Sequence, residues 1–389
     1  MKTLRRALPL GLAGLMLAAV PGTALAGSPE FARTAEEWAT LRDDVIEYGE
    51  LESLIEEYNT TVQTNWLDLN EFRKKYGETK DDVSAEYRDM ADEIYSSIDY
   101  PDADDPTYGY VVPSVLAAEV QAKNMEKQAD DNLEDADIIY WNYQQAEKTL
   151  VTVAQTNMIS YQKDQLELQQ AEIAKKQAEI SLAAAQSKLA VGTGTQVDVL
   201  NAQETLQNAE RNITSTQTGI DTVRQKLQLM LGWRFDAAPE IREVPVSDMS
   251  RIGQMNPQAD LDKAIENNYT VIVNKKKVAN SVSTDTINTL NKTIEDNQRK
   301  IGSSLTTNYQ NVLTAKLAYD QAVAELDLEN RNLQTVQAQY QQGTASKNQL
   351  DNQQYTVQNK QLAIKVADLN LLQTMETYDW AVNGLASTS

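Results

Sequence analysis

The 389-residue sequence contains neither cysteine nor histidine. The protein therefore has no disulfides, no cysteine-linked lipid anchor and no thiol nucleophile, and it lacks the usual zinc ligands and the most common general base. No set of nucleophile, base and metal ligands can be assembled from the remaining side chains. We expect a protein that is not an enzyme and that has no cofactor and no metal site.

Positive charge is also scarce. There are 35 Lys and Arg residues against 57 Asp and Glu, which gives a formal net charge of −22. Such a chain repels phosphate backbones, so we expect no nucleic-acid partner.

Long apolar runs are missing except near the N-terminus. Residues 7–20 are apolar, follow a basic start and precede a small-x-small cleavage site at 24–26. This pattern predicts an export signal over residues 1–26, by the general secretory route, because 14 apolar residues are too few for a membrane helix. We expect the mature protein in the cell envelope: the outer membrane, the periplasm or the extracytoplasmic surface.

Proline is confined to a few places, and residues 114–238 and 258–389 contain none. Both blocks are rich in Ala, Gln, Leu, Glu, Lys and Asn, the composition of solvated helices. The sequence therefore predicts an all-α fold. The expected helices cover residues 34–75, 80–98, 114–190, 196–231, 259–280, 286–341 and 346–382, with an irregular stretch at 99–113.

An internal repeat organises the chain. Gly192-Thr193-Gly194-Thr195 recurs 151 residues later as Gly343-Thr344-Ala345-Ser346, and a weaker match at an offset of 210 pairs Ile55 and Glu56 with Ile265 and Glu266. We expect a first repeat at 27–232 with an irregular insert at about 76–113, a linker at 233–257 and a second repeat at 258–389.

Apolar residues recur every seven positions after each glycine turn. Leu206, Ile213, Ile220 and Leu227 are followed at the same offset by Val357, Ile364, Leu371 and Tyr378. This spacing predicts long antiparallel coiled-coil helices. A helix over residues 286–341 would be roughly 84 Å long, too long to bury in a compact core, so lateral copies are expected. An ordinary antiparallel coiled coil is the alternative.

The two turns can be explained structurally. Gly192 and Gly343 suit the left-handed conformation that ends a helix, and Thr195 and Ser346 suit the cap of the next helix. Exposed tips with small side chains could also admit the backbone of a partner.

The segment 191–203, VGTGTQVDVLNAQ, resembles the repeat signature of TolC-like outer-membrane efflux proteins, and the segments 54–59 (LIEEYN) and 263–268 (KAIENN) are similar to the helix that opens each half in that family. The resemblance implies a homotrimeric helical barrel around a duct, served by an inner-membrane pump and a periplasmic-type adaptor. It also implies that the adaptor docks at the helical tips, here Val191, Gly192, Thr193, Gly194, Thr195, Gly343, Thr344, Ala345 and Ser346.

The sequence departs from this family where two membrane strands are expected in each half. Such strands need about 9 to 11 residues with alternating apolar side chains. Residues 278–299 are polar, and of residues 76–113 only 107–112 could form a strand. We expect the β-barrel to be absent or vestigial, and nothing else in the sequence holds the protein in a bilayer.

The duct constriction also differs. The family has acidic residues six and nine positions after the second glycine, where this chain has Gln349 and Asn352, with Asp351 beside them. The matching residues of the first half are Asp198 and Asn201. A relocated ring of carboxylates and a set of solvated polar residues are equally compatible with this pattern.

One acidic cluster comprises Asp99, Asp102, Asp104 and Asp105. Closely spaced carboxylates can bind calcium, but the glycine and the distal glutamate of an EF-hand loop are missing. A solvated loop that separates two helices is the favoured interpretation.

Together these features predict an exit duct or a tip-docking component of an efflux or secretion assembly. The alternative is an exported structural coiled-coil protein of the cell envelope that has no conduit.

Overall fold

The computed structural model describes residues 33–234 and 236–389. The export signal expected at 1–26 lies outside these residues. The helices are α1 (Ala35–Leu41), α2 (Leu51–Tyr58), α3 (Thr60–Tyr76), α4 (Lys80–Ser97), α5 (Tyr108–Asp131), α6 (Ala136–Ala190), α7 (Gln196–Met230), α8 (Leu261–Asn267), α9 (Tyr269–Asn280), α10 (Thr284–Gln341) and α11 (Lys347–Trp380). Short 3₁₀ turns lie at Tyr48–Glu50 and Met249–Gln254, and a π turn at Ala381–Leu385 ends the last helix.

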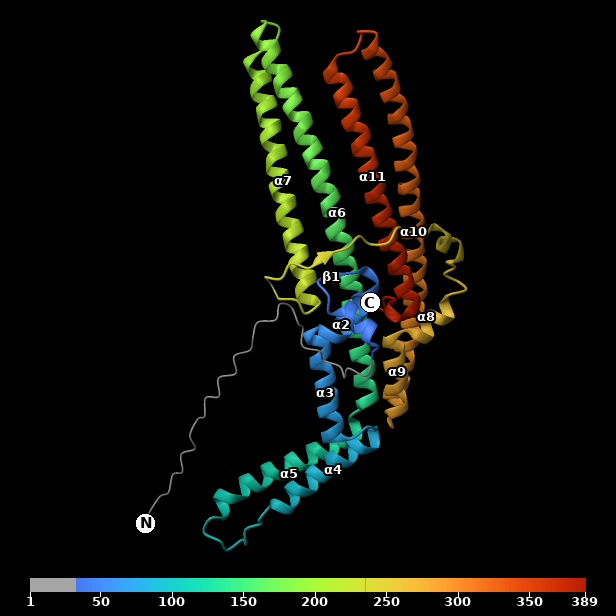
Figure 1. Cartoon of the computed structure of the whole chain (residues 1–389). Coiled ribbons are helices and arrows are strands. Elements are labelled where there is room, and N and C mark those ends of the chain that lie inside the picture. The colour runs from blue at the N-terminus through green and yellow to red at the C-terminus, as the bar shows by residue number, and fades with distance from the viewer. Residues whose placement is uncertain (1–32, 235) are drawn as a thin grey trace, which may run out of the picture.

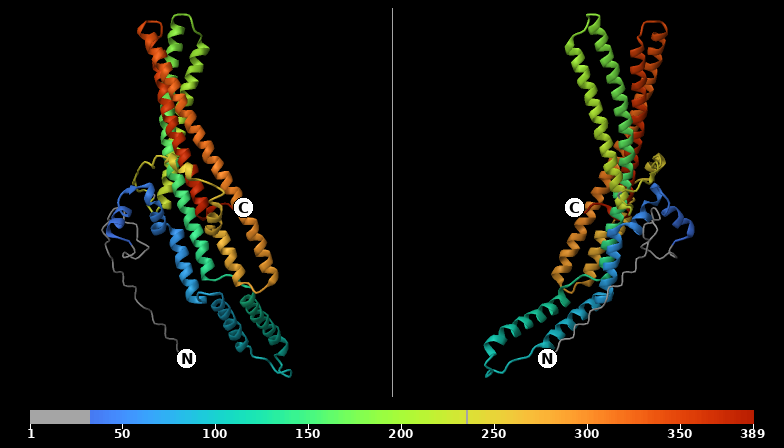
Figure 2. Two further views of the ribbon diagram at one scale, coloured as in Figure 1. Left: turned by 90° about the vertical axis from the view of Figure 1, so that its right-hand side faces the viewer. Right: turned by 60° about the vertical axis from the view of Figure 1, so that its left-hand side comes forward.

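Two long antiparallel hairpins, α6–α7 and α10–α11, dominate the molecule and point the same way (Figures 1 and 2). The predicted seven-residue stripe packs each pair, and it is most deeply buried near the base, at Ile220, Leu227, Leu371 and Tyr378. The hairpins also contact each other through α6 and α11, where the Trp380 indole donates to Gln155 Oε1 at 2.7 Å.

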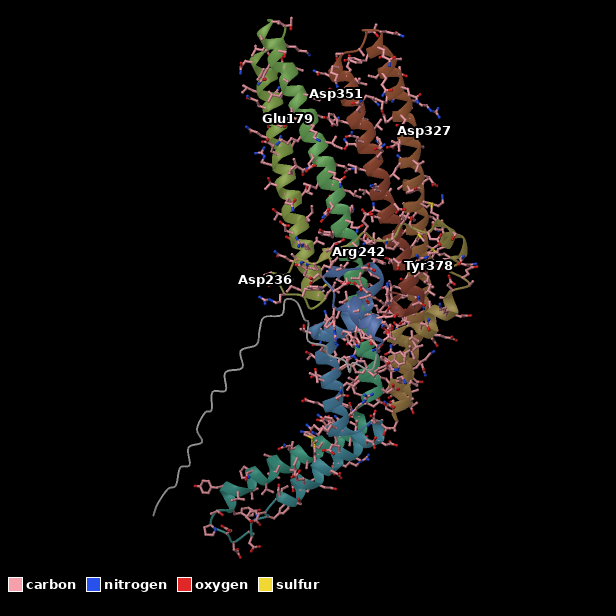
Figure 3. All side chains as sticks on the ribbon, in the orientation of Figure 1. Glu179, Asp236, Arg242, Asp327, Asp351 and Tyr378 are labelled. Carbon is pink, nitrogen blue, oxygen red and sulfur yellow. The ribbon has the colours of Figure 1, made fainter. Side chains whose placement is uncertain are left out.

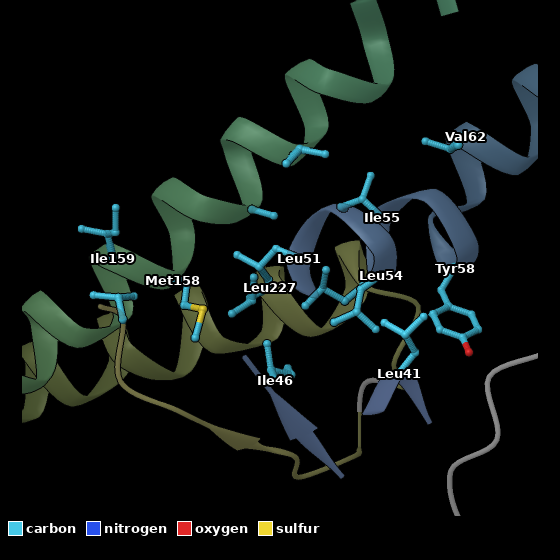
Figure 4. Packing of buried hydrophobic residues seen from close by; sticks show 14 of the residues in the cluster. Leu41, Ile46, Leu51, Leu54, Ile55, Tyr58, Val62, Met158, Ile159 and Leu227 are labelled. Carbon is cyan, nitrogen blue, oxygen red and sulfur yellow. The ribbon is translucent and has the colours of Figure 1, made fainter. Parts of the chain in front are cut away.

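The core lies at the base of the hairpins. Apolar side chains of α2, including Leu51 and Leu54, pack against Met158 and Ile159 of α6 and Leu227 of α7 (Figure 4). A second buried cluster joins α8, α9, α10 and α11. The long rods are therefore anchored at one end and extend freely at the other.

The linker between the two halves pairs with the segment that precedes α2. Strands β1 (Val45–Ile46) and β2 (Glu240–Ile241) pair in parallel. The Glu240 amide donates to Asp44 O at 2.8 Å, and the Arg242 amide donates to Ile46 O at 3.0 Å.

Three expected helices are interrupted, so the predictions of unbroken helices at 34–75, 114–190 and 259–280 are wrong. Residues 42–50 break the first of them, because they contain β1 and a 3₁₀ turn, and it breaks again at Asn59. At Asn59 the side-chain oxygen accepts the Thr61 amide at 3.0 Å, and the side-chain nitrogen donates to Met230 O at 2.9 Å. At Asp135 the carboxylate caps α6, and it also accepts a hydrogen bond from the side-chain nitrogen of Asn280 at 2.7 Å. The breaks at Asn59 and Asp135 therefore depend on polar caps that long-range hydrogen bonds hold in place.

The opening helices of the two halves match at an offset of 209, which separates the segments 54–59 and 263–268, and not at the offset of 210. Asn268 caps α9 as Asn59 caps α3, and its side-chain nitrogen donates to Gly384 O and Ala386 O at 3.2 and 3.0 Å. Since these asparagines are 209 residues apart, the predicted offset of 210 is wrong by one residue. The offset of 209 also places the buried Val271 opposite the buried Val62.

Residues 99–113 are more helical than expected. Helix α5 begins at Tyr108 and includes Pro113, so the strand considered at 107–112 is wrong. A proline here removes only the hydrogen bond to Gly109, an exposed residue whose carbonyl water can satisfy. Of residues 278–299, all but 281–283 are helical. Within the described chain, no helix has the length and apolar character needed to cross a membrane.

Candidate docking site at the hairpin tips

The α6–α7 tip is closed by its own backbone. Gly192 has φ +75°, and the carbonyl of Lys188 accepts the Thr193 and Gly194 amides at 2.9 and 3.0 Å. The Thr193 hydroxyl donates to the same carbonyl at 3.2 Å. Thr193 is exposed, but its hydroxyl is used to close the turn.

The α10–α11 tip repeats this geometry. Gly343 has φ +73°, and the carbonyl of Gln339 accepts the Thr344 and Ala345 amides at 2.9 and 3.2 Å. The Thr344 hydroxyl donates to it at 3.0 Å. The repeat read from the sequence at an offset of 151 is therefore also a repeat of hydrogen bonds.

Each following helix begins with a reciprocal cap. Thr195 donates its amide and its hydroxyl to Asp198 Oδ2, both at 2.8 Å, and the Asp198 amide donates back to Thr195 Oγ1 at 3.2 Å. Ser346 and Gln349 form the same arrangement, with the Ser346 amide 2.7 Å from Gln349 Oε1. The predicted capping roles of Thr195 and Ser346 are confirmed.

The cap makes the first tip sensitive to pH. Hydrogen bonds from the Thr195 amide and hydroxyl lower the pKa of the Asp198 carboxyl. A lowered folded-state pKa contributes stability above the unfolded-state pKa, and this contribution is lost as the pH falls through the folded-state pKa. We expect the melting temperature of Asp198→Asn, which keeps an acceptor oxygen, to fall less than that of the wild type as the pH drops below about 4.

Thermal melts of both proteins between neutral and acidic pH test this expectation. Gln349→Glu is the converse variant, because it introduces a titratable cap at the second tip and should steepen the acid-dependent loss. A constant difference between wild type and Asp198→Asn at every pH would contradict the assignment.

The residues considered for the duct constriction lie near the two tips. Asp198 and Gln349 are exposed and turn back to cap their helices, and Asn201 is exposed one turn further along α7. Asp351 is half-buried and pairs with Lys347 at the start of α11 (Figure 3). Asn352 is also half-buried. In the described part of the chain, no hydrogen bond or ion pair joins these α7 residues to these α11 residues, so the constriction stays a prediction.

The two tips differ in surface chemistry, which the sequence analysis missed. Val191 is 74% exposed, and Val197 and Leu200 are also exposed. The residues 151 positions later are polar: Gln342, Asn348 and Asp351. Comparing the repeats for polarity as well as for identity would have found this difference. The first tip therefore presents apolar surface, and the second presents amides and an ion pair.

The acidic segment before α5 is a capped loop. The Asp105 carboxylate accepts the Thr107 amide at 2.7 Å and the Thr107 hydroxyl at 2.6 Å, and these bonds lower its pKa. Over residues 33–234 and 236–389, no three Asp, Glu, His or Cys side chains are grouped so that they could hold a metal ion.

The fold, but not the sequence, matches known proteins. No family model and no curated protein matches the sequence. A membrane protein from Pseudomonas aeruginosa has a TM-score of 0.53 at 14% identity, over 87% of this chain and 90% of that chain. CusC, whose structures concern transmembrane channel formation, has a TM-score of 0.53 at 11% identity, over 95% of this chain and 99% of that chain.

CusC is a TolC-family outer-membrane efflux channel. The resemblance noticed at the glycine turns is thus confirmed at the level of the fold. The prediction of an all-α chain built from long paired helices in two repeats is confirmed as well.

Proposed function

We propose that the protein is a TolC-like exit duct, or the tip-docking component, of an efflux or secretion assembly. It would act in the cell envelope as a homotrimer, with a periplasmic-type adaptor and an inner-membrane pump. The observation that carries the proposal is the duplicated tip: two hairpins end in the same glycine turn and the same reciprocal cap, on a fold that spans nearly all of CusC. The duplication supports the repeats proposed at 27–232 and 258–389, joined by the linker at 233–257.

Exposed apolar side chains along α10 support an assembly in which the long helices of several copies lie side by side. Leu317, halfway along α10, is 67% exposed, and Leu313, Val323 and Leu328 on the same helix are also exposed. A single chain leaves these apolar side chains in water, whereas a neighbouring rod would bury them. Three copies side by side would enclose a duct, in which Asp198, Asn201, Gln349, Asp351 and Asn352 would form the constriction near the tips.

We expect the mature protein to be a rod-shaped trimer in solution. Light scattering should give three times the chain mass, and small-angle X-ray scattering should give an elongated particle. Leu317→Glu should dissociate the trimer, because it places a charge in the proposed lateral contact. The control Gln334→Glu adds the same charge to the same helix at an exposed polar position and should leave the trimer intact.

A monodisperse monomer at micromolar concentration would contradict the duct. That outcome would favour the exported structural coiled-coil protein instead.

A further inference from the structure

The α4–α5 hairpin projects from the end of the molecule opposite the tips (Figures 1 and 2). Its helices pack on each other through small side chains, with Ala91 on α4 and Ala122 and Ala129 on α5 fully buried. The Arg88–Asp130 ion pair and the hydrogen bond from Tyr100 to Glu119 fix the antiparallel register. The hairpin is thus a two-helix ribbon whose two outer edges have no partner within the described chain.

The outer edge of α5 is apolar and basic. Leu116 and Val120, which are 54% and 58% exposed, lie one turn apart on the same side of the helix. The next residues on this side are Lys123 and Lys127, which are exposed and have no ion-pair partner among the described residues. An apolar surface followed by two free lysines is unusual on an isolated helix of an acidic protein.

The outer edge of α4 has the opposite charge. Asp89, Asp92 and Glu93 are exposed on the side of α4 that faces away from α5, and none has an ion-pair partner in the part of the chain that the structure describes. The register places Asp92 and Glu93 at about the same level along the hairpin as Lys127, between the Arg88–Asp130 and Tyr100–Glu119 contacts.

We propose that the α5 edge of one hairpin binds the α4 edge of the hairpin in the next copy, so that the copies close into a ring of paired helices at this end of the assembly. The proposal rests on the homotrimer of the proposed function. Two α5 edges would bring lysines together, and two α4 edges would bring carboxylates together, so a symmetric contact between like edges is disfavoured. A contact between unlike edges is heterologous, and heterologous contacts close into rings when the rotation permits.

A membrane surface is the competing occupant of the α5 edge. The acidic edge of α4 and the carboxylates of residues 99–105 lie on the same small hairpin and would be repelled by anionic lipid. The charges therefore favour a second copy of the chain.

Cross-linking tests the proposal without background, because the chain has no cysteine. Two differently tagged chains, one carrying Lys127→Cys and the other Glu93→Cys, are co-expressed and oxidised. We expect disulfide-linked dimers that contain both tags, while Lys127→Cys alone and Glu93→Cys alone give little product. Ser187→Cys is the matched control, because Ser187 is exposed near the far end of α6. A chain with Ser187→Cys should not cross-link to a chain with Lys127→Cys or to a chain with Glu93→Cys.

Charge reversal then separates electrostatic pairing from proximity. The readout is the fraction of disulfide-linked dimer between a chain with Val120→Cys and a chain with Ser96→Cys. Lys123→Glu with Lys127→Glu should lower this fraction at least about tenfold. Adding Asp89→Lys, Asp92→Lys and Glu93→Lys to the same chain should restore the disulfide-linked fraction, because the charges of the two edges are then opposite again.

The outcomes distinguish this surface from the function. A trimer by light scattering without mixed dimers would overturn the ring and leave the duct intact, whereas a monomer would remove both. Dimers between two Lys127→Cys chains would also overturn the ring. The ring would also be overturned if the Lys127→Cys variant floated with vesicles of three parts phosphatidylcholine to one part phosphatidylglycerol and its thiol were then shielded from a water-soluble maleimide.

Discussion

Gly384→Ala should lower the stability of the protein by about 2 to 5 kcal/mol. Gly384 has φ +118°, where a side chain is strained, and an added Cβ would lie 2.7 Å from Asn267 O and 2.9 Å from Tyr269 Cε2. The Gly384 carbonyl also accepts the Asn268 side chain. A shift of this backbone would therefore disturb the cap of α9 as well as the packing at the end of α11.

Gly219→Ala is the matched control for this variant. Gly219 lies inside α7, and nothing lies within 4 Å of the position that a Cβ would take. Alanine there should stabilise the helix by about 0.5 to 1 kcal/mol. Denaturant unfolding followed by circular dichroism compares the two variants, and equal midpoints would refute the steric assignment at Gly384.

The largest functional effect is expected from Thr193→Trp combined with Thr344→Trp. Both threonines are exposed at the tips and have no special backbone angle, so tryptophan adds bulk at the cost of one hydroxyl hydrogen bond per turn, about 1 kcal/mol. We expect unchanged helicity and an intact trimer. Adaptor binding should fall at least about a hundredfold, and export should be lost, because the bulk holds off the closely approaching partner.

Thr193→Ser with Thr344→Ser keeps both hydroxyl groups and adds no bulk. This control should bind the adaptor and export as the wild type does. Binding is measured by surface plasmon resonance with the immobilised trimer, and export by the accumulation of a fluorescent pump substrate in cells. Normal export by the double tryptophan variant would mean that the turns only end their helices.

The tips could be predicted from the sequence because their geometry is local. A glycine that needs positive φ, followed by Thr or Ser three residues before Asp or Gln, specifies a turn and a reciprocal cap without distant help. The breaks at Asn59 and Asp135 could not be predicted, because asparagine and aspartate also stand inside the helices of this chain, as at Asn201 and Asp221. What fixes these breaks is distant in the sequence: Met230 O for Asn59 and Asn280 for Asp135.

The contrast between the two tips was hidden for a different reason. Comparing the repeats shows that Val197 and Leu200 stand where the second half has polar residues. Their exposure depends on which side of α7 the partner helix covers, which the sequence does not give. The edge charges of α4 and α5 were hidden in the same way, since their placement depends on which side of each helix the partner covers. Residues that act between copies cannot be placed by helical periodicity alone.

The pairing of β1 with β2 has a consequence for the order of folding during synthesis. The Glu47–Arg242 ion pair beside these strands joins residues 195 positions apart, so the first strand waits for nearly the whole first half of the chain before it can pair. Such a contact raises the contact order, whereas the contacts within each long hairpin join neighbouring helices. The α6–α7 hairpin should therefore form first as the chain is made, and the strand pair should close afterwards, once residue 241 is free of the ribosome.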